Sequence, residues 1–179
     1  ETIEAHVQAA RRARDAGFDG VEVWAAYHGM LDQFWTPWSN RRDDKWGGSL
    51  ENRTRFSREI INRIRKVCGQ DFIVGLALSD DPDTAVTLKR EAQAEIVSLH
   101  DRSGDIDYVT CGYGSYFNFW PLMPTFIYPE KLGADLASVI KGAVKHALVT
   151  SEAHIRTPEN AESVLSEGQP SIWRQVWTA

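Results

Sequence analysis

The stretch GVEVWAAYHGMLDQFWTPWSNRRDDKWGGSLENRTRF, residues 20–56, decides the fold. It opens with an apolar run that predicts a buried strand over 20–26. It closes with Ser49, a residue type that caps helices, ahead of an amphipathic segment. Between strand and helix lies a polar and aromatic loop too long to be a simple connector. We therefore expect this loop to belong to a functional site.

The same order of strand and helix recurs along the chain. Apolar runs at 71–79, 106–114 and 147–153 predict three more buried strands, each followed by a helical pattern. Such alternation is typical of βαβ units and a parallel sheet. The long loops follow strands and the returns are short, which favours a (β/α) barrel. A doubly wound sheet would also place its site there, but no G-x-G-x-x-G follows any strand.

Local signals set the limits of the helices. We expect Thr2 to cap a first helix that stops at Gly17. Asp83 or Thr84 is expected to open the helix after the second strand. Thr157, which precedes a proline, is expected to cap the last helix.

The length of the chain limits how much of a barrel it can form. A complete eight-stranded barrel takes about 250 residues, whereas this chain has 179 and shows four strands. The expected fold class is therefore α/β, a partial (β/α)8 TIM barrel with about four βα units over residues 1–168. Residues 169–179 carry no apolar strand and are expected to form an irregular tail.

Composition narrows the classes of partner. The chain has 20 basic and 25 acidic residues, a net charge of −5 and no Lys/Arg run, so no nucleic acid is expected. No apolar run is long enough for a bilayer and no export signal is visible, so we expect no membrane partner and a cytoplasmic location. Cys68 and Cys111 are isolated, which predicts neither a disulfide framework nor a metal site.

Tryptophan is unusually frequent, with seven in the chain. Four of them fall in the opening stretch: Trp24, Trp35, Trp38 and Trp46. A single Trp usually fills core space. Four in one polar loop favour a wall that faces a ligand.

The opening stretch resembles the old yellow enzyme group of FMN-dependent oxidoreductases, also called the NADH:flavin oxidoreductase family. The matching pattern is DQF-x-x-P-x-x-N-x-R-x-D-x-aromatic-GGSLENR-x-RF, which runs from Asp32 to Phe56. Weaker likeness in VGLALS and TPENAESVLSEG extends the resemblance to about residue 168. The resemblance implies that the four strands are the fourth to seventh of the family's barrel. It also implies FMN as cofactor, a small-molecule substrate and a nicotinamide or electron-transfer partner.

The residues of this block have a physical role that does not depend on the family. Asn40, Arg42 and Asp44 stand at alternate positions, where they can hydrogen-bond the loop to itself. Gly47 and Gly48 allow sharp turning before the helix cap. We interpret most of the block as holding the loop in shape rather than as catalytic.

The chain departs from the family where the substrate carbonyl would bind. Alkene-reducing relatives carry His-x-x-Asn or His-x-x-His at the end of the fourth strand, with a Tyr two residues later. Here Trp24 and Tyr27 occupy the pair and Gly29 replaces the Tyr. An indole is a donor only and a poor match for an anionic oxygen site, and Gly29 donates no proton from a side chain, so carbonyl activation and protonation of an alkene are not expected from these positions.

The flavin contacts implied by the resemblance also change. Ala77 stands where the family has an Arg at the flavin's pyrimidine edge, so a cation near the reduced flavin is lost. Ala153 and His154 replace the Gly and Arg of the phosphate-binding turn. Glu152 would repel a phosphate if it pointed inward, and Arg156 would compensate.

The aromatic replacements resemble the trimethylamine dehydrogenase branch, which binds methylated amines in an aromatic bowl. The candidate substrate-binding residues are Trp24, Tyr113, Tyr116 and Trp120, with Tyr27, Phe117 and Phe119 near them. Aromatic faces attract a methylated ammonium. Tyr27 and His28 are the candidate catalytic residues, the latter as a base or donor near the amine.

Three functions follow. The first is FMN-dependent oxidation of an N-methylated amine or N-methyl amino acid. The second is an ene- or dienoyl-reductase whose proton donor has moved to Tyr27 or His28. The third is a catalytically silent half-barrel, which Ala77 and the unusual carboxyl end favour and which predicts little or no bound flavin in the chain alone. The amine branch carries an iron–sulfur cluster after its barrel, but two scattered cysteines cannot ligate one, so none is expected here.

Overall fold

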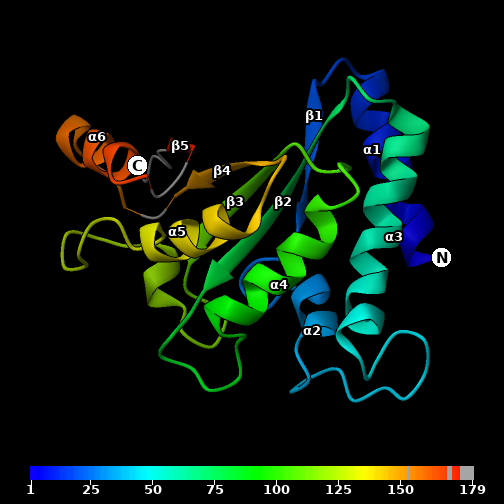
Figure 1. Ribbon diagram of the computed structural model, residues 1–179, viewed down its shortest axis with the longest axis horizontal. Coiled ribbons are helices and arrows are strands. Elements are labelled where there is room, and N and C mark those ends of the chain that lie inside the picture. Colours follow the sequence, from blue (N-terminus) through cyan, green and yellow to red (C-terminus); the bar gives the residue numbers. More distant parts are fainter. Residues whose placement is uncertain (153, 169–170, 174–179) are drawn as a thin grey trace.

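A computed structural model describes residues 1–152, 154–168 and 171–173 of the chain, which form one curved parallel sheet flanked by helices (Figure 1). The strands lie side by side in chain order. They are β1 (Gly20–Trp24), β2 (Ile73–Asp80), β3 (Tyr108–Tyr113), β4 (Leu148–Ser151) and β5 (Ile172–Trp173). Every neighbouring pair is parallel, so all the carboxyl ends meet at one edge.

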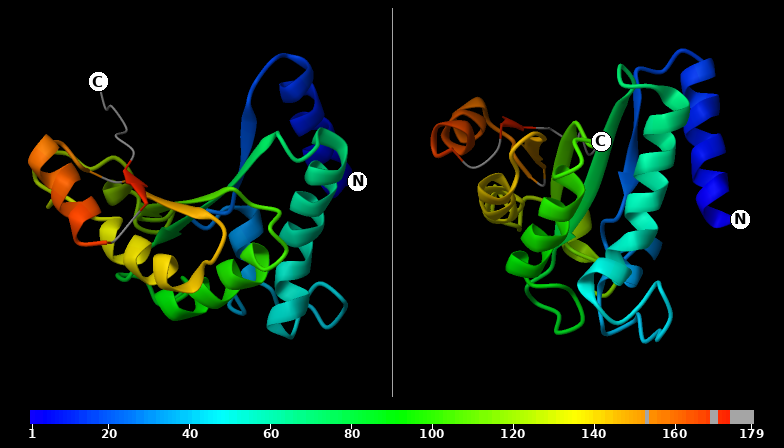
Figure 2. Two further views of the ribbon diagram at one scale, coloured as in Figure 1. Left: turned by 45° about the horizontal axis from the view of Figure 1, so that its top comes forward. Right: turned by 45° about the vertical axis from the view of Figure 1, so that its right-hand side comes forward.

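The main helices lie on the convex side of the sheet, and the concave side faces away from them (Figure 2). The helices are α1 (Thr2–Asp15), α2 (Met30–Trp35), α3 (Leu50–Cys68), α4 (Arg90–Asp101), α5 (Ala134–Ala143) and α6 (Pro158–Ser166), with a short 3-10 turn η1 (Trp120–Leu122). Within the described part of the chain, no helix is both long and apolar enough to cross a bilayer.

The core lies between the sheet and the helices. Strand residues alternate in direction, so Val23, Leu76 and Val109 are buried against the helices. Their neighbours Trp24 and Leu148 point to the concave side, and both are 48% exposed. The concave face is thus the open face of the molecule, as expected for the interior of a barrel of which only part is present.

Arg65 ties the amino ends of the central strands to α3. Its side chain is buried and donates hydrogen bonds to the carbonyls of Phe72 at 2.6 Å and Asp105 at 2.8 Å. It also forms an ion pair with Asp107 at 2.7 Å. The guanidinium therefore joins the segments that lead into β2 and β3.

The sequence predicts most of this architecture correctly. The four expected strands and the parallel sheet are present. Ser49 accepts a hydrogen bond from the Asn52 amide, and Thr157 accepts one from Asn160, so both predicted caps are confirmed. The Thr2 cap is wrong, because the helix already includes Thr2 and its N-cap is Glu1, which makes no capping bond.

The start of α4 also differs from the prediction. The helix begins at Arg90, and not at Asp83 or Thr84. The Thr87 hydroxyl donates to the Asp81 carbonyl at 2.7 Å, which holds the preceding segment as a loop. Side-chain bonds to the backbone compete with helix formation in this way.

Two further elements were missed. The polar loop after β1 contains the six-residue helix α2. The expected irregular tail contains β5, whose Ile172 pairs with Thr150 of β4. The amide of Ser171, just before it, donates to the Val149 carbonyl at 2.6 Å. A two-residue strand is held by such backbone bonds and carries no side-chain periodicity that a sequence could reveal.

Candidate active site at the carboxyl end of the sheet

The chain leaves β1 through a strained turn that sets the direction of two candidate residues. Tyr27 and His28 have φ angles of 59° and 64°, in the left-handed region that non-glycine residues rarely adopt. The Gly29 amide donates to the Ala26 carbonyl at 2.9 Å, as in a type I′ turn. The Tyr27 amide donates to the Ser79 hydroxyl of β2 at 2.7 Å. Backbone strain of this kind clusters at functional sites.

The turn directs Tyr27 across the concave face to β4. Its hydroxyl donates to Glu152 Oε1 at 2.9 Å. The pair passes directly over Gly112 of β3, where a Cβ would lie 2.8 Å from the Tyr27 hydroxyl and 2.9 Å from Glu152 Oε1. Trp24 completes the arrangement, with its ring centroid 5.3 Å from that of Tyr27 at 57°. We call Trp24, Tyr27, Gly112 and Glu152 the aromatic–carboxylate corner.

The corner presents its aromatic rings outward and its charge inward. Trp24 is half exposed, whereas Glu152 is buried at the end of β4. A ligand on the concave side would meet the aromatic rings first, with a carboxylate behind them. This order suits an organic cation, which aromatic faces and a carboxylate both attract.

A second carboxylate lies on the same concave face, closer to the amino ends of the strands. Glu22 of β1 accepts a hydrogen bond from the Thr110 hydroxyl of β3 at 2.5 Å. In the strand register Glu22 precedes Trp24 by two residues, so this pair lies one layer below the corner. The hydrogen bond between Thr110 and Glu22 joins β3 to β1 and lies farther from the carboxyl edge of the sheet than the corner does.

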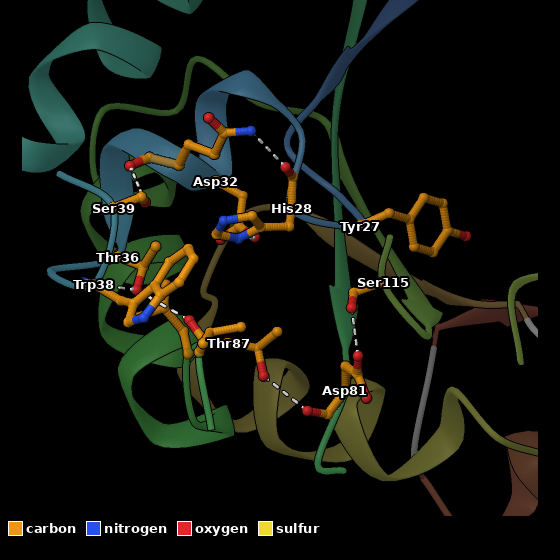
Figure 3. Close-up of polar contacts among 12 residues, drawn as sticks. Tyr27, His28, Asp32, Thr36, Trp38, Ser39, Asp81, Thr87 and Ser115 are labelled. Carbon is orange, nitrogen blue, oxygen red and sulfur yellow. Dashed lines mark hydrogen bonds and ion pairs between the residues drawn. The ribbon is translucent and has the colours of Figure 1, made fainter. Parts of the chain in front are cut away.

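His28 points the opposite way from Tyr27 (Figure 3). Its Nδ1 lies 3.2 Å from Asp32 Oδ2 of α2, and its ring packs against Trp38 and Phe117 at centroid distances of 5.7 and 4.9 Å. The His28 imidazole is buried among these three side chains. The structure therefore separates the two residues that the sequence analysis paired as catalytic.

The remaining predicted substrate contacts do not gather at the corner. Tyr113 lines a cavity of about 320 Å³ with Arg90 and Asp135, on the helix side of β3. Burial raises its pKa, and nearby aspartates add to the rise. Tyr116 is connected to the turn through its amide, which donates to the Tyr27 carbonyl at 3.2 Å, but its ring is 63% exposed. Trp120 is 74% exposed on η1.

The carboxyl end of β4 holds unsatisfied polar atoms. Among the described residues, the buried side-chain atoms without a hydrogen-bond partner are Thr150 Oγ1, Ser151 Oγ and His154 Nε2. Buried polar groups are normally paired, so these three atoms make the end of β4 exceptional in the described part of the chain. Ala153, also predicted to contact a cofactor, lies outside the described residues.

Arg156 follows this segment and is held by a carboxylate. Its Nε lies 3.2 Å from Glu130 Oε1, and its amide donates to Glu130 Oε2 at 3.0 Å. That amide bond is the main cause of the lowered pKa of Glu130. Burial, followed by the charge of Arg156, lowers the pKa of His154. An unsatisfied imidazole nitrogen beside a guanidinium fits an anionic group such as a phosphate.

Ala77 brings no cation to the concave face. It is buried in β2, in register with Trp24 on β1 and Thr110 on β3. Its methyl group adds neither charge nor bulk to the concave face beside the corner. At this level of the sheet, β2 therefore supplies no positive charge to a ligand on the concave face.

The matched loop block supports the site without contributing to it. Asn40 donates to the carbonyls of Phe34 and Trp46 at 2.6 and 2.8 Å, and Arg42 forms an ion pair with Asp44. The Arg42 bond is the largest cause of an Asp44 pKa lowered to about 2. These contacts agree with the interpretation that the block holds the loop to itself.

The four tryptophans of the opening stretch divide between core and surface. Trp35 is buried and donates to the Ser57 hydroxyl at 2.9 Å, and Trp46 packs on Phe56. Trp24 and Trp38 are 48% and 46% exposed. Only Trp24 belongs to the corner, since Trp38 packs on His28. The expected wall of four indoles is therefore wrong.

Two residues of the site were not selected from the sequence. Ser79 holds the turn, and Glu152, which the sequence analysis names only as a charge that would repel a phosphate, accepts the Tyr27 hydroxyl. Strand parity offers a signal for both, because alternate residues of neighbouring strands share a face. Ser79 follows Ala77 by two residues, and Glu152 follows Thr150 by two.

A curved parallel sheet with helices on its convex side, and with its polar and aromatic residues at the carboxyl edge, defines part of a (β/α)8 barrel of the enzyme type. The chain belongs to the NADH:flavin oxidoreductase / NADH oxidase family, whose model matches residues 1–173. The family resemblance of the sequence and the partial-barrel fold are thereby confirmed. The family also implies a flavin cofactor for its members.

Relatives of different activity match over most of the chain. The N,N-dimethylglycine/sarcosine dehydrogenase of Chromohalobacter salexigens is 32% identical over 169 residues, which cover 93% of this chain and 24% of that protein. The NADH oxidase of Thermoanaerobacter brockii is 34% identical over 174 residues, which cover 94% and 26%. The chain thus spans about a quarter of the length of these curated relatives.

Solved structures give the same fold. The complex of 2-naphthoyl-CoA reductase with 2-naphthoyl-CoA superposes with a TM-score of 0.88 at 32% identity, covering 97% of this chain and 26% of that one. Morphinone reductase in complex with tetrahydroNAD gives 0.73 at 25% identity, covering 98% and 44%.

Proposed function

We propose that this chain is part of an FMN-dependent oxidoreductase that oxidises an N-methylated amine or an N-methyl amino acid. The observation that carries the proposal is the aromatic–carboxylate corner, in which Trp24 and Tyr27 lie 5.3 Å apart above Glu152. The relative from Chromohalobacter salexigens, named for N,N-dimethylglycine and sarcosine, supports the same substrate class.

The corner has the chemistry to recognise a methylated ammonium. Each aromatic face contributes about 0.5–2 kcal/mol to binding a cation, with the larger value in a site from which water is excluded. The Glu152 carboxylate adds a charge of opposite sign. A neutral carbonyl substrate would gain little from either feature.

The residues at the end of β4 fit the phosphate of FMN. His154 Nε2 is buried without a partner among the described residues, and Arg156 lies two positions later. We infer that these two residues hold the phosphate, with Glu130 released from Arg156 when it binds. Bound FMN supplies the acceptor for a hydride from the N-methyl group.

A second candidate function is the reduction of an activated alkene. It is favoured by the position of the Tyr27 hydroxyl at the carboxyl edge, where a proton donor would be needed. Cinnamate reductase of Clostridium sporogenes is 50% identical over 80 residues, which cover 44% of this chain and 12% of that protein. The match is shorter than that of the amine dehydrogenase.

The test uses the full-length protein that contains this sequence, purified with FMN. We expect formaldehyde release from sarcosine or N,N-dimethylglycine, and little reduction of cinnamate. Trp24→Ala should raise KM for the amine about 5- to 30-fold, by loss of roughly 1–2 kcal/mol of cation–π binding. Trp38→Ala is the matched control, because Trp38 is equally exposed but packs on His28. Alkene turnover without formaldehyde release would replace the first function with the second.

A further inference from the structure

We propose that Glu152 is the proton acceptor behind Tyr27, so that the two residues together remove the proton of the substrate ammonium. This inference rests on the proposed function and adds a residue to it. Its basis is the hydrogen bond in which the Tyr27 hydroxyl donates to Glu152 Oε1 at 2.9 Å. Tyr27 faces the open concave side, and the carboxylate lies behind it.

The chemistry requires such an acceptor. An N-methyl amine is protonated at neutral pH, and its nitrogen must regain its lone pair before the methyl group can give up a hydride. In the proposed step, the ammonium N–H proton moves to the Tyr27 oxygen while the Tyr27 hydroxyl proton moves to Glu152. The amine becomes neutral, the phenol is restored and Glu152 becomes a carboxylic acid that later returns its proton to water. Nothing is oxidised or reduced in this step.

One hydrogen bond and two glycines allow Tyr27 and Glu152 to meet. Ser79 fixes the Tyr27 amide at 2.7 Å, so the strained turn aims the phenol at β4. Gly112 leaves the space through which the hydroxyl reaches the carboxylate. At Gly133, ahead of α5, a Cβ would lie 2.6 Å from the Cys111 carbonyl oxygen and closer still to that of Glu152, so this glycine lets the chain pass close to the Glu152 backbone.

Among the described residues, other titratable groups lie near Glu152 and have different roles. The Cys111 thiol lies in the core on the helix side of β3, and burial, followed by the charges of Glu152 and Asp80, raises its pKa strongly. Asp80 at the end of β2 is engaged by Arg90 at 2.5 Å. His154, two residues along the chain, is assigned to the phosphate. Among the described residues, Tyr27 therefore provides the link from Glu152 to the concave side.

The experiment measures formaldehyde release by the full-length, FMN-loaded enzyme from about pH 6 to pH 10. Glu152→Gln keeps the shape of the side chain and removes its ability to accept a proton. We expect kcat at neutral pH to fall about 100-fold, which is the ordinary size of a general-base effect. Activity should recover as the pH approaches the pKa of the free amine, because neutral substrate then needs no base.

Tyr27→Phe is the second variant, and it retains the ring while removing the hydroxyl through which the proton passes. It should show the same loss and the same recovery at high pH. Glu22→Gln is the matched control, because Glu22 also accepts a hydroxyl hydrogen bond on the concave face but lies below the corner. Its kcat and pH profile should be those of the wild-type protein.

The outcomes separate the inference from the function on which it rests. No formaldehyde from the wild-type enzyme overturns both. Formaldehyde release with an unchanged pH profile in Glu152→Gln overturns the proton transfer alone. So does a loss that stays the same at high pH in variants that retain FMN absorbance, since that result describes a structural role. If Glu152→Gln fails to fold, the pH profile of Tyr27→Phe decides.

Discussion

The Ser79 hydroxyl accepts the Tyr27 amide hydrogen at 2.7 Å and joins the end of β2 to the turn that follows β1. Because this turn has two consecutive residues with positive φ, it depends on such external bonds to keep its shape. Ser79 thus acts on the phenol of Tyr27 through the backbone.

Replacing Ser79 should therefore lower kcat/KM for the amine clearly, while the free energy of unfolding changes little. Ser79→Ala is expected to lower the unfolding free energy by about 1 kcal/mol and kcat/KM for the amine about five- to tenfold, as the turn relaxes. Ser103→Ala is a suitable control, because its hydroxyl bonds the His100 carbonyl away from the site. Equal kcat/KM in the two variants would contradict a positioning role for Ser79.

A methyl group at Gly112 should displace the aromatic–carboxylate corner. The added Cβ would lie within 3 Å of both the Tyr27 hydroxyl and the Glu152 carboxylate, whose ends must then move apart. We expect Gly112→Ala to fold and to lose at least tenfold in kcat, measured by formaldehyde release. Gly142→Ala in α5 has open space around its Cβ and should leave activity unchanged, with a stability gain of up to about 1 kcal/mol. Full activity in Gly112→Ala would count against the corner.

His100 should make the protein sensitive to mild acid. It is buried between α3 and α4, with Nε2 at 2.8 Å from the Ser57 hydroxyl and Nδ1 at 2.7 Å from the Ile96 carbonyl, and burial lowers its pKa to about 4. The unfolded state binds a proton near pH 6.5, so it takes up more protons than the folded state between these values. Stability should therefore fall as the pH drops from about 6.5 to 4, by roughly 3 kcal/mol.

Urea unfolding at several pH values would measure this loss. His100→Gln should be less stable at neutral pH but should show a flatter pH dependence in this range. The exposed His146 serves as the control, since His146→Gln should retain the wild-type slope. An unchanged slope in His100→Gln would show that other groups cause the acid sensitivity.

The phosphate assignment predicts a change in flavin affinity. Arg156→Ala and His154→Ala should each weaken FMN binding about 10- to 100-fold, the effect of losing one hydrogen bond to a charged group. Flavin fluorescence during titration of the apoprotein gives the Kd. Arg11→Ala, on the exposed side of α1, should have no effect. FMN affinity that is unchanged in both site variants would place the phosphate elsewhere.

The sequence predicts the scaffold better than the site. Apolar runs and caps identify the strands and most helices, because burial and capping leave local signals, as at Ser49 and Thr157. The grouping of Trp24 with Tyr27 also follows from their place at a strand end. The direction of His28 does not follow, since it depends on two φ angles that no residue pattern encodes. The bond between Tyr27 and Glu152 joins residues 125 positions apart, and such pairing is visible only when the strands are in register.

Arg65 lies at the opposite ends of the strands from this site, where its three contacts join α3 to the segments that lead into β2 and β3. Since the carboxyl end of α3 is fixed to the amino ends of β2 and β3, the carboxyl ends of the strands can exchange side chains while the scaffold stays intact. Substitutions at Trp24 and Tyr27 then leave the anchored ends of the strands unchanged. New substrates would be reached through the rim, by single steps that each leave a folded protein.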